Sequence, residues 1–385
     1  MTSAALRDAP RAARGGTLLL GIALGGASDA AGWRERLGLA AWAEALGLHS
    51  VWLPEGHFGP GATASPLVAL AAIAARTQRL RLGTTSLLLP IHHPLRIATE
   101  VSVLDALSCG RVWLGLGRGF REPVFQGFGV ASRTKRDRFD EALDAILEAW
   151  SGSAFRLAGR HFTALDASDD VRPAPRPVQR PHPPLLVAAF GPKGLLQAAR
   201  RGLAYLASPL ETLEVLEENY ALHRANLPTG AELAPVRVPV MRTLHVAGDD
   251  AEAKRALAGL EREFPGRRGD ARGALARAAG GRLEDRVLVG SESAVADGIA
   301  RYRERLGLDL LVARVQIPGI TDAETRASLE RLATRVASSF GAFETVEGPG
   351  PGGALRSGPS PGPARPGRPS HVLGERDDAE TPTGG

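Results

Sequence analysis

Leu80 to Phe120, with the sequence LRLGTTSLLLPIHHPLRIATEVSVLDALSCGRVWLGLGRGF, decides the fold. Its first part, up to Leu89, is rich in leucine and threonine, which is typical of a strand buried on both faces. Pro94 stands where a helix can begin, and Gly110 stands where that helix would end. Val112 to Leu116 then predicts the next strand. The stretch therefore predicts one strand–helix–strand unit of a parallel sheet.

Two helices in this part of the chain show an apolar stripe. For the helix after Pro94 we expect the stripe to consist of Ile97, Val101, Val103, Leu104 and Leu107. The pattern from Thr134 to Trp150 is clearer, because acidic residues occupy the opposite face. Its predicted inner face consists of Phe139, Leu143, Ile146, Leu147 and Trp150.

A glycine-rich turn closes the stretch. Gly115, Gly117 and Gly119 flank Arg118 at the carboxyl end of the predicted strand. In a barrel of parallel strands this end carries the active site, and glycines there let the backbone approach a ligand. A guanidinium can bind two phosphate oxygens at once. The turn predicts half of a phosphate site, although the same residues also fit a tight turn with a solvated arginine.

Apolar runs alternate with helical patterns along most of the chain, which indicates a parallel sheet with crossover helices. A TIM-type (β/α)8 barrel accounts for this better than an open doubly wound sheet. We expect strands near 17–23, 50–53, 80–88, 112–116, 185–189, 204–207, 240–246 and 310–317.

The chain of 385 residues is long enough for one large barrel domain, which we place at 17–343. Residues 1–16 and the tail 347–385, which is dense in proline and glycine, are expected to be disordered. The segment Phe264 to Arg286 is rich in glycine and arginine. It fits a mobile lid over the barrel or a plain surface insertion.

Composition excludes several classes. The net charge is +5, but the chain has only three lysines and its arginines are spread among acidic residues, so we expect no nucleic-acid partner. A single cysteine, Cys109, rules out an internal disulfide framework and a multi-cysteine metal site. No apolar run is long enough to cross a membrane. We therefore expect a cytoplasmic protein without a metal site.

The runs LGTTSLLLPIHHPLR and LDALSCGRVWLGLGRGF closely resemble the bacterial luciferase-like flavin monooxygenases. The resemblance extends, more thinly, from Thr17 to Phe343. It implies a TIM barrel that binds flavin mononucleotide (FMN) at the carboxyl ends of its strands.

The resemblance assigns cofactor contacts to the third and fourth strands. Thr84, Thr85 and Ser86 match a tight strand end beneath the flavin ring, with a cis peptide bond implied between Thr85 and Ser86. Arg118, with Gly117 beside it, is implied as the phosphate ligand.

A second phosphate contact is expected where GPKG opens a helix. Oriented N–H groups at a helix amino end favour an anion, so Gly191, Lys193 and Gly194 are candidate contacts. The family usually has serine or threonine hydroxyls at the two glycine positions, so backbone amides and Lys193 would have to replace them. A glycine-lined turn with an exposed lysine is the simpler interpretation.

The second strand ends in VWLPEGHF, which places Glu55 and His57 at the barrel mouth. The resembling luciferases carry two adjacent histidines after this glutamate, of which the first is a catalytic base; that position is Gly56 here. An imidazole exchanges protons near neutral pH, so we assign His57 as the catalytic proton carrier and Glu55 as its orienting partner. The alternative is that His57 only makes a hydrogen bond within its loop. His92 and His93 do not suggest a metal site, because two adjacent histidines rarely fit one coordination geometry.

The resemblance implies a reaction in which reduced FMN, supplied by a separate flavin reductase, meets O2 and forms a C4a-peroxide that oxygenates a small organic substrate. Three alternatives remain open: hydride transfer with the deazaflavin F420, an FMN-dependent oxidoreductase without oxygen insertion, and a non-catalytic flavin-binding or partner subunit. We expect a homodimer or a heterodimer, as is usual for the family.

Overall fold

The fold is described by a computed structural model of residues 17–340, apart from 60, 164–173, 232, 234 and 269–272. The predictions for 1–16, for 347–385 and for the last residues of the barrel domain lie outside the described residues.

The described strands form one sheet in which every strand pairing is parallel. The strands are β1 (Leu19–Ala23), β2 (Ser50–Leu53), β3 (Arg81–Thr84), β4 (Leu87–Leu88), β5 (Val112–Gly117), β6 (Leu185–Ala188), β7 (Ala204–Leu206), β8 (Pro239–Val246), β9 (Val287–Gly290) and β10 (Leu310–Arg314). Their order is β7-β6-β5-β3-β2-β1-β10-β8-β9, and β4 pairs with β5. Directly after β7, Ala207 forms a parallel bridge with Val240 of β8. The predicted α/β fold and each predicted strand are confirmed, whereas β9 was not foreseen.

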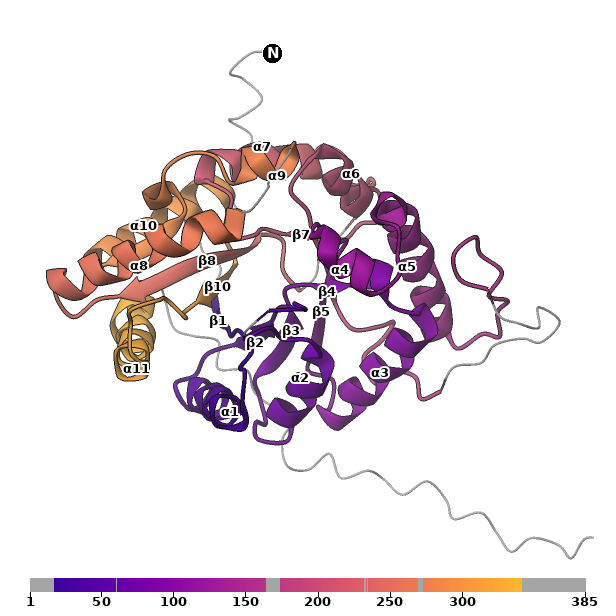
Figure 1. The fold of residues 1–385 in the computed structure, drawn as a ribbon, viewed down its shortest axis with the longest axis horizontal. Helices are drawn as coiled ribbons and strands as arrows, with labels where there is room; N and C mark the ends of the chain where they lie inside the picture. The colour runs from indigo at the N-terminus through magenta and orange to yellow at the C-terminus, as the bar shows by residue number, and fades with distance from the viewer. Residues whose placement is uncertain are drawn as a thin grey trace, which may run out of the picture. The chain divides into compact units, whose positions relative to one another are not determined.

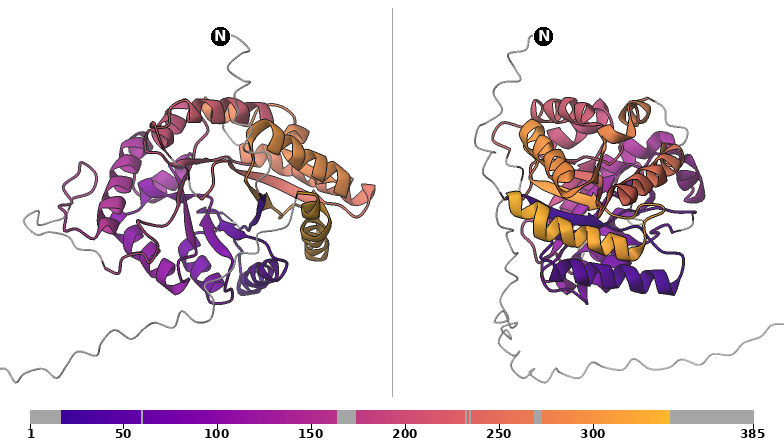
Figure 2. Two further views of the ribbon diagram at one scale, coloured as in Figure 1. Left: turned by 180° about the vertical axis from the view of Figure 1, so that it is seen from behind. Right: turned by 90° about the vertical axis from the view of Figure 1, so that its left-hand side faces the viewer.

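Helices lie around the outside of the strands, as Figure 1 and the two views in Figure 2 show. They are α1 (Ala30–Ala45), α2 (Pro66–Ala74), α3 (Pro94–Leu107), α4 (Glu122–Gly127), α5 (Lys135–Ser151), α6 (Pro192–Arg200), α7 (Leu213–Arg224), α8 (Asp250–Arg268), α9 (Ala274–Ala278), α10 (Glu292–Leu306) and α11 (Asp322–Arg331). Prolines begin α2, α3 and α6, where a missing backbone N–H leaves no bond unmade. Gly152 and Gly307 end α5 and α10 in the left-handed conformation.

The outer core lies between the sheet and these helices. The expected inner face of α5 is confirmed, with Phe139, Leu143, Ile146 and Trp150 buried and Leu147 partly so. The stripe expected on α3 is wrong for two residues. Val103 is 44% exposed and Leu107 is 64% exposed, because α3 turns only the face carrying Ile97, Val101 and Leu104 toward the sheet.

A second apolar cluster combines residues of most strands with Trp52 and Trp113, whose rings meet edge to face at 6.2 Å. Gly83 is required beside it, because a Cβ there would lie 2.1 Å from a carbon of the Trp52 ring. The close fit brings β2 and β3 together in register, so that the ends of both strands deliver their loops to the same edge of the sheet.

The third predicted strand is interrupted. It is divided into β3 and β4 by the Thr85–Ser86 peptide bond, which is cis as the resemblance implied. The hydroxyl of Thr84 donates to the Gly115 carbonyl (2.7 Å), and the Thr85 N–H donates to the Leu53 carbonyl (2.8 Å). These bonds hold the break between β2 and β5.

The predicted lid or insertion begins inside a helix. Phe264 belongs to the nineteen-residue α8, and α9 follows at Ala274. Gly259 of α8 packs so closely against Pro318, in the loop after β10, that a Cβ would lie 1.8 Å from the Pro318 carbonyl oxygen. The segment is therefore anchored over the carboxyl end of β10 from its first helix.

Candidate functional site

The candidate site lies at the edge of the sheet where the parallel strands have their carboxyl ends, here called the carboxyl edge. Glu55 and His57 follow β2, the Thr85–Ser86 bond follows β3, Arg118 follows β5, and Gly191 follows β6. Because β2, β3, β5 and β6 are neighbours, their loops meet at one place. The structure thus brings the predicted residues of these four loops to one edge of the sheet.

Glu55 is the centre of the polar part of the site. Its side chain is sealed from solvent, and its Oε1 accepts a hydrogen bond from Nε2 of His57 (2.8 Å). Its Oε2 accepts the backbone N–H of Leu88 (2.6 Å). Burial raises the pKa of Glu55, but the hydrogen bonds from His92, from the Leu88 N–H and from His57 outweigh burial and bring the pKa below its usual value. The carboxylate is therefore ionised and acts as an acceptor only.

Sequence reasoning missed His92 as a member of this site. Its Nε2 donates to the same Oε1 of Glu55 at 2.7 Å. His92 stands just after the turn Leu89–Ile91, between β4 and α3, so the third strand's loop delivers it to Glu55. The signal in the sequence was a histidine following a predicted strand next to the strand that carries Glu55. His93 occupies the N-cap position of α3 without a side-chain capping bond.

The backbones of β3, β4 and β5 approach one another very closely at the carboxyl edge. A Cβ on Gly115 would lie 1.9 Å from the Thr84 carbonyl oxygen, and a Cβ on Gly117 would lie 1.9 Å from Oγ of Ser86. Oγ1 of Thr85 is buried and has no hydrogen-bond partner among the described residues. The close packing of these strands depends on Gly115, and it leaves the Thr85 hydroxyl as a buried polar group without a partner among the described residues.

Arg118 lies against the amino end of α6. A Cβ on Gly194 would lie 1.9 Å from Nη2 of Arg118, so a larger residue at 194 would displace the guanidinium from its present position. Burial, followed by the nearby Arg136, lowers the pKa of Arg118; burial, followed by Arg118, lowers that of Lys135. These cations repel one another, and no ion pair of Arg118 is recorded among the described residues. An anion placed between them would relieve the repulsion.

Gly191 and Lys193 complete the candidate phosphate loop. Gly191 is the N-cap of α6, and a Cβ there would lie 2.4 Å from Cβ of Ala274 in α9. Lys193 is the second residue of α6 and is exposed. The structure thus brings Gly194 to Arg118, while the Lys193 side chain remains in solvent.

Aromatic rings surround the polar groups. Phe58 and Phe128 are 64% and 41% exposed, and the His57 ring lies 4.7 Å from the Phe128 ring and 5.8 Å from the Phe58 ring. On the Arg118 side, Phe120 meets Phe190 edge to face at 6.0 Å. Exposed phenyl rings beside buried polar groups are typical of a site for a largely apolar ligand.

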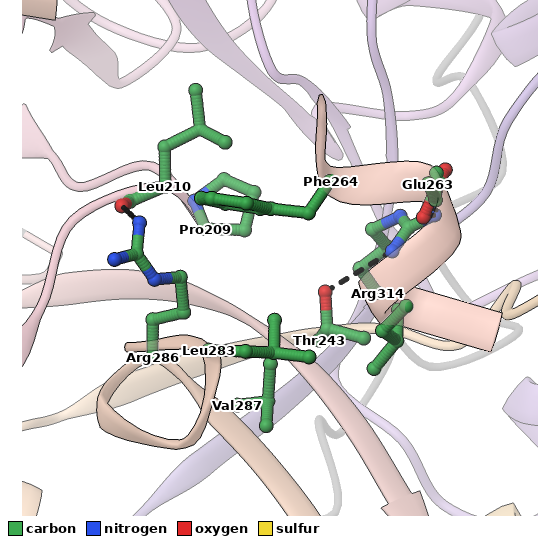
Figure 3. Close-up of a pocket in the computed structure, with 10 residues that line it drawn as sticks. Pro209, Leu210, Thr243, Glu263, Phe264, Leu283, Arg286, Val287 and Arg314 are labelled. Carbon is green, nitrogen blue, oxygen red and sulfur yellow. Dashed lines mark hydrogen bonds and ion pairs between the residues drawn. The ribbon is translucent and has the colours of Figure 1, made fainter. Parts of the chain in front are cut away.

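A small pocket opens on the other half of the carboxyl edge, between α8, β9 and the end of β7 (Figure 3). The guanidinium of Arg314 pairs with Glu263 (2.6 Å) and donates to Thr243 (3.1 Å), and the guanidinium of Arg286 lies 4.6 Å from the centre of the Phe264 ring. The charged side chains that line this pocket have partners within the protein. In this respect the pocket differs from the surroundings of Arg118.

The residues at the carboxyl edge around Arg118 and the Thr85–Ser86 bond fit a flavin nucleotide. The Arg118 guanidinium and the α6 amino end would hold its phosphate, and the glycine-lined backbone from Thr84 to Ser86 would lie against its ring.

Among the described residues no group of three or more histidine, cysteine or acidic side chains is arranged to hold a metal ion. In the same part of the chain no helix has the length and apolar character needed to span a membrane.

Comparison with known proteins agrees with this fit. The oxygenase component of flavin-dependent trigonelline monooxygenase from Acinetobacter baylyi is 29% identical over 179 residues, which are 46% of this chain and 48% of that protein. An F420-dependent glucose-6-phosphate dehydrogenase from Kineococcus radiotolerans is 35% identical over 190 residues, 46% of this chain and 53% of that protein. The chain thus spans about half the length of these curated relatives.

The crystal structure of monooxygenase RslO1 from Streptomyces bottropensis superposes with a TM-score of 0.71 and 28% identity, over 84% of this chain and 100% of that chain. The family model described as luciferase-like monooxygenase matches residues 15–309, most of the chain. The chain belongs to the luciferase-like monooxygenase family.

Proposed function

We propose that the protein is the oxygenating component of a two-component flavin monooxygenase. It takes FMN that a separate flavin reductase has reduced, and it uses O2 to introduce an oxygen atom into a small organic substrate. The observation that carries the proposal is the contact between Arg118 and Gly194, which puts an unpaired guanidinium at the amino end of α6. The relative named as an oxygenase component supports the role of a reductase.

We further propose that the strands form a closed eight-stranded barrel around this site. The bridge between Ala207 and Val240 supports closure, because its two hydrogen bonds (3.1 and 3.0 Å) join the end of β7 to β8. A closed barrel would fix the spacing between the loops after β2, β5 and β6. Such fixed spacing suits a site assembled from several loops.

Each residue has a defined task in this proposal. Arg118 and the α6 N–H groups bind the cofactor phosphate, and Lys193 adds a solvent-exposed cation at the same helix end. The flavin ring rests against Thr84, Thr85, Ser86 and Gly117. Bound reduced FMN supplies the electrons that activate O2. The phenyl rings of Phe58 and Phe128 exclude water. His57 accepts or returns a proton at its Nδ1 while Glu55 holds the imidazole in place.

Cofactor titration tests the proposal directly. We expect the purified protein to bind FMN and, once the flavin is reduced, to consume O2 and yield a product that carries one atom of labelled oxygen. Replacing Gly194 by Val would displace Arg118, so FMN affinity is expected to fall about tenfold, as for loss of one charge-assisted contact. The control is Gly38→Ala, because a Cβ at Gly38 in α1 meets no atom within 4 Å. Unchanged FMN affinity in Gly194→Val would contradict the assigned phosphate site.

F420-dependent hydride transfer is the second candidate, and the Kineococcus relative supports it. A parallel titration with F420 separates the two: tighter binding of F420, together with substrate oxidation that needs no O2, would replace the monooxygenase proposal. Tight FMN binding without O2 uptake would leave an FMN-dependent oxidoreductase without oxygen insertion or a non-catalytic partner subunit, and Gly56 favours the latter because the family's first histidine is missing there.

Replacement of His57 by Ala tests the proton-transfer assignment. We expect kcat to fall by about a hundredfold, the typical contribution of a positioned acid or base, with FMN affinity nearly unchanged. The measurement is single-turnover product formation at saturating FMN. An unchanged rate would leave His57 with a hydrogen-bonding role in its loop.

A further inference from the structure

Two imidazoles from different loops share one carboxylate oxygen. Nε2 of His57 lies 2.8 Å and Nε2 of His92 lies 2.7 Å from Oε1 of Glu55. The two histidines belong to the loops after β2 and β4, and Glu55 belongs to the first of these loops. No other charged side chain among the described residues is recorded in contact with either ring. The recorded ring contacts of His57 are those with Phe58 and Phe128.

This sharing determines where the ring protons are. An ionised carboxylate only accepts hydrogen bonds, so both rings must carry a proton on Nε2. In the neutral ring Nδ1 is then the free acceptor. Neither Nδ1 has a recorded partner among the described residues, and neither is one of the buried polar atoms left unpaired there. Both Nδ1 atoms are therefore within reach of solvent or a ligand.

We propose that His92 is a positioning residue of the site: by donating to Oε1 of Glu55 it keeps that carboxylate an acceptor, and so holds His57 with Nδ1 as its one free acceptor atom. His92 acts through Glu55 and is not itself the catalytic residue. Its kinetic consequence rests on the proposed function, whereas the state of the His57 ring does not.

Because Glu55 is buried, its carboxylate needs hydrogen-bond donors such as His92 to stay ionised. Its side chain is 0% exposed, and a carboxyl group without water around it tends to keep its proton. Burial is the largest influence on the pKa of Glu55 and raises it, and the hydrogen bond from His92 is the largest influence that lowers it. A protonated Glu55 could donate to His57, which would move the ring proton of His57 to Nδ1 and remove the free acceptor.

Nuclear magnetic resonance of the apoprotein tests the inference without any cofactor. With 15N-labelled histidine at about pH 8.5, roughly two units above the usual histidine pKa, we expect His57 and His92 to carry their protons on Nε2. With 13C-labelled glutamate, His92→Phe is expected to raise the pH at which Glu55 titrates by about one unit, as for loss of one hydrogen bond to a charged group. His92→Gln, which keeps an N–H donor, should leave the Glu55 titration near that of the wild type.

The matched control is His93→Gln, because His93 is adjacent in sequence and its ring contacts Phe162 instead of Glu55. It should leave both His57 and Glu55 signals unchanged. A wild-type His57 ring protonated on Nδ1 would overturn the proposal, and this readout holds even where a variant does not fold. An unchanged Glu55 titration in folded His92→Phe would overturn it as well.

Kinetics supply an independent readout. We expect His92→Phe to lower kcat about tenfold with KM unchanged, and His92→Gln to recover most of the loss, since an orienting partner is typically worth less than the base itself. A kcat equal to that of the wild type in His92→Phe would contradict the role. If the protein binds no flavin, the proposed function fails, but the resonance measurements still decide whether His92 positions His57.

Discussion

Glu55 makes four hydrogen bonds, one through its backbone N–H and three through its buried carboxylate. Its backbone N–H donates to the Ser86 carbonyl (3.3 Å), and its two carboxylate oxygens accept from His57, His92 and Leu88. The carboxylate therefore ties the loop after β2 to the segment that follows the Thr85–Ser86 bond. Stability and proton chemistry depend on the same ionised side chain.

Acid should weaken the fold through this residue. The pKa of Glu55 is lowered in the folded state, so the unfolded chain binds more protons in acid and stability falls with decreasing pH. The contribution is complete above the ordinary glutamate pKa of about 4.3 and is lost as the pH falls through the folded-state pKa. We expect Glu55→Gln to be less stable than the wild type near neutral pH and to show a shallower loss of stability below about pH 5.

Urea unfolding at a series of pH values measures this difference. Glu148→Gln is the control, because Glu148 is an exposed carboxylate on α5, and it should keep the wild-type profile. Parallel profiles for the wild type and Glu55→Gln would show that Glu55 does not couple folding to protons.

At this scale Glu55, His57 and Arg118 were candidates because each stands in a motif beside a strand end, whereas the Thr85–Ser86 bond was implied only by the family resemblance. His92 escaped prediction, since it lies 37 positions after Glu55 and its place after a predicted strand does not by itself show that the two side chains meet. The contact depends on the side-chain rotamers of His92 and Glu55, which come from two different loops. Rotamers follow from packing and not from spacing.

Among the elements, α9 explains an unusual feature of the phosphate loop. Ala274 of α9 occupies the space that a side chain at Gly191 would need. The hydroxyl residue usual in the family would therefore clash with Ala274 here, which the sequence alone did not reveal because 191 and 274 belong to distant segments. Similarly β9 was missed, since VLVG is short and follows an arginine-rich segment without a clear pattern.

A paired substitution tests the steric explanation. Gly191→Ser should destabilise the protein by about 1–3 kcal/mol, as is typical of overpacking, and weaken FMN binding by displacing the amino end of α6. Adding Ala274→Gly to Gly191→Ser should restore stability, because it removes the opposing Cβ. Thermal unfolding and FMN titration of the two single variants and the double variant give the coupling. Additive effects would show that Ala274 does not restrict position 191.

At the scale of the whole molecule, three large apolar side chains are exposed on α2 and α3. Val68, Val103 and Leu107 are 72%, 44% and 64% exposed, and the two helices pack against each other. Exposed apolar side chains gathered on neighbouring helices are typical of association surfaces. They support the proposed dimer, in which this face meets a second copy of the chain.

Light scattering coupled to size-exclusion chromatography tests this proposal. We expect the wild type to elute as a dimer and Leu107→Glu to shift toward the monomer, because a charge in an apolar interface is costly to bury. Lys254→Glu, on the exposed face of α8, is the control and should remain dimeric. A monomeric wild type would exclude the homodimer and leave a heterodimer to be sought by co-purification.

The pair of indole rings enclosed by the strands has a spectroscopic consequence. Trp52 and Trp113 lie in the cluster inside the sheet, and Trp52 covers Gly83, two residues before Thr85. Both rings are buried, so we expect their emission to be that of indoles in an apolar environment. A yellow chromophore arriving at Thr85 and Ser86 would take up that emission by energy transfer. If flavin binds as proposed, quenching of the Trp52 and Trp113 part of the emission of the five tryptophans would report cofactor loading without a label.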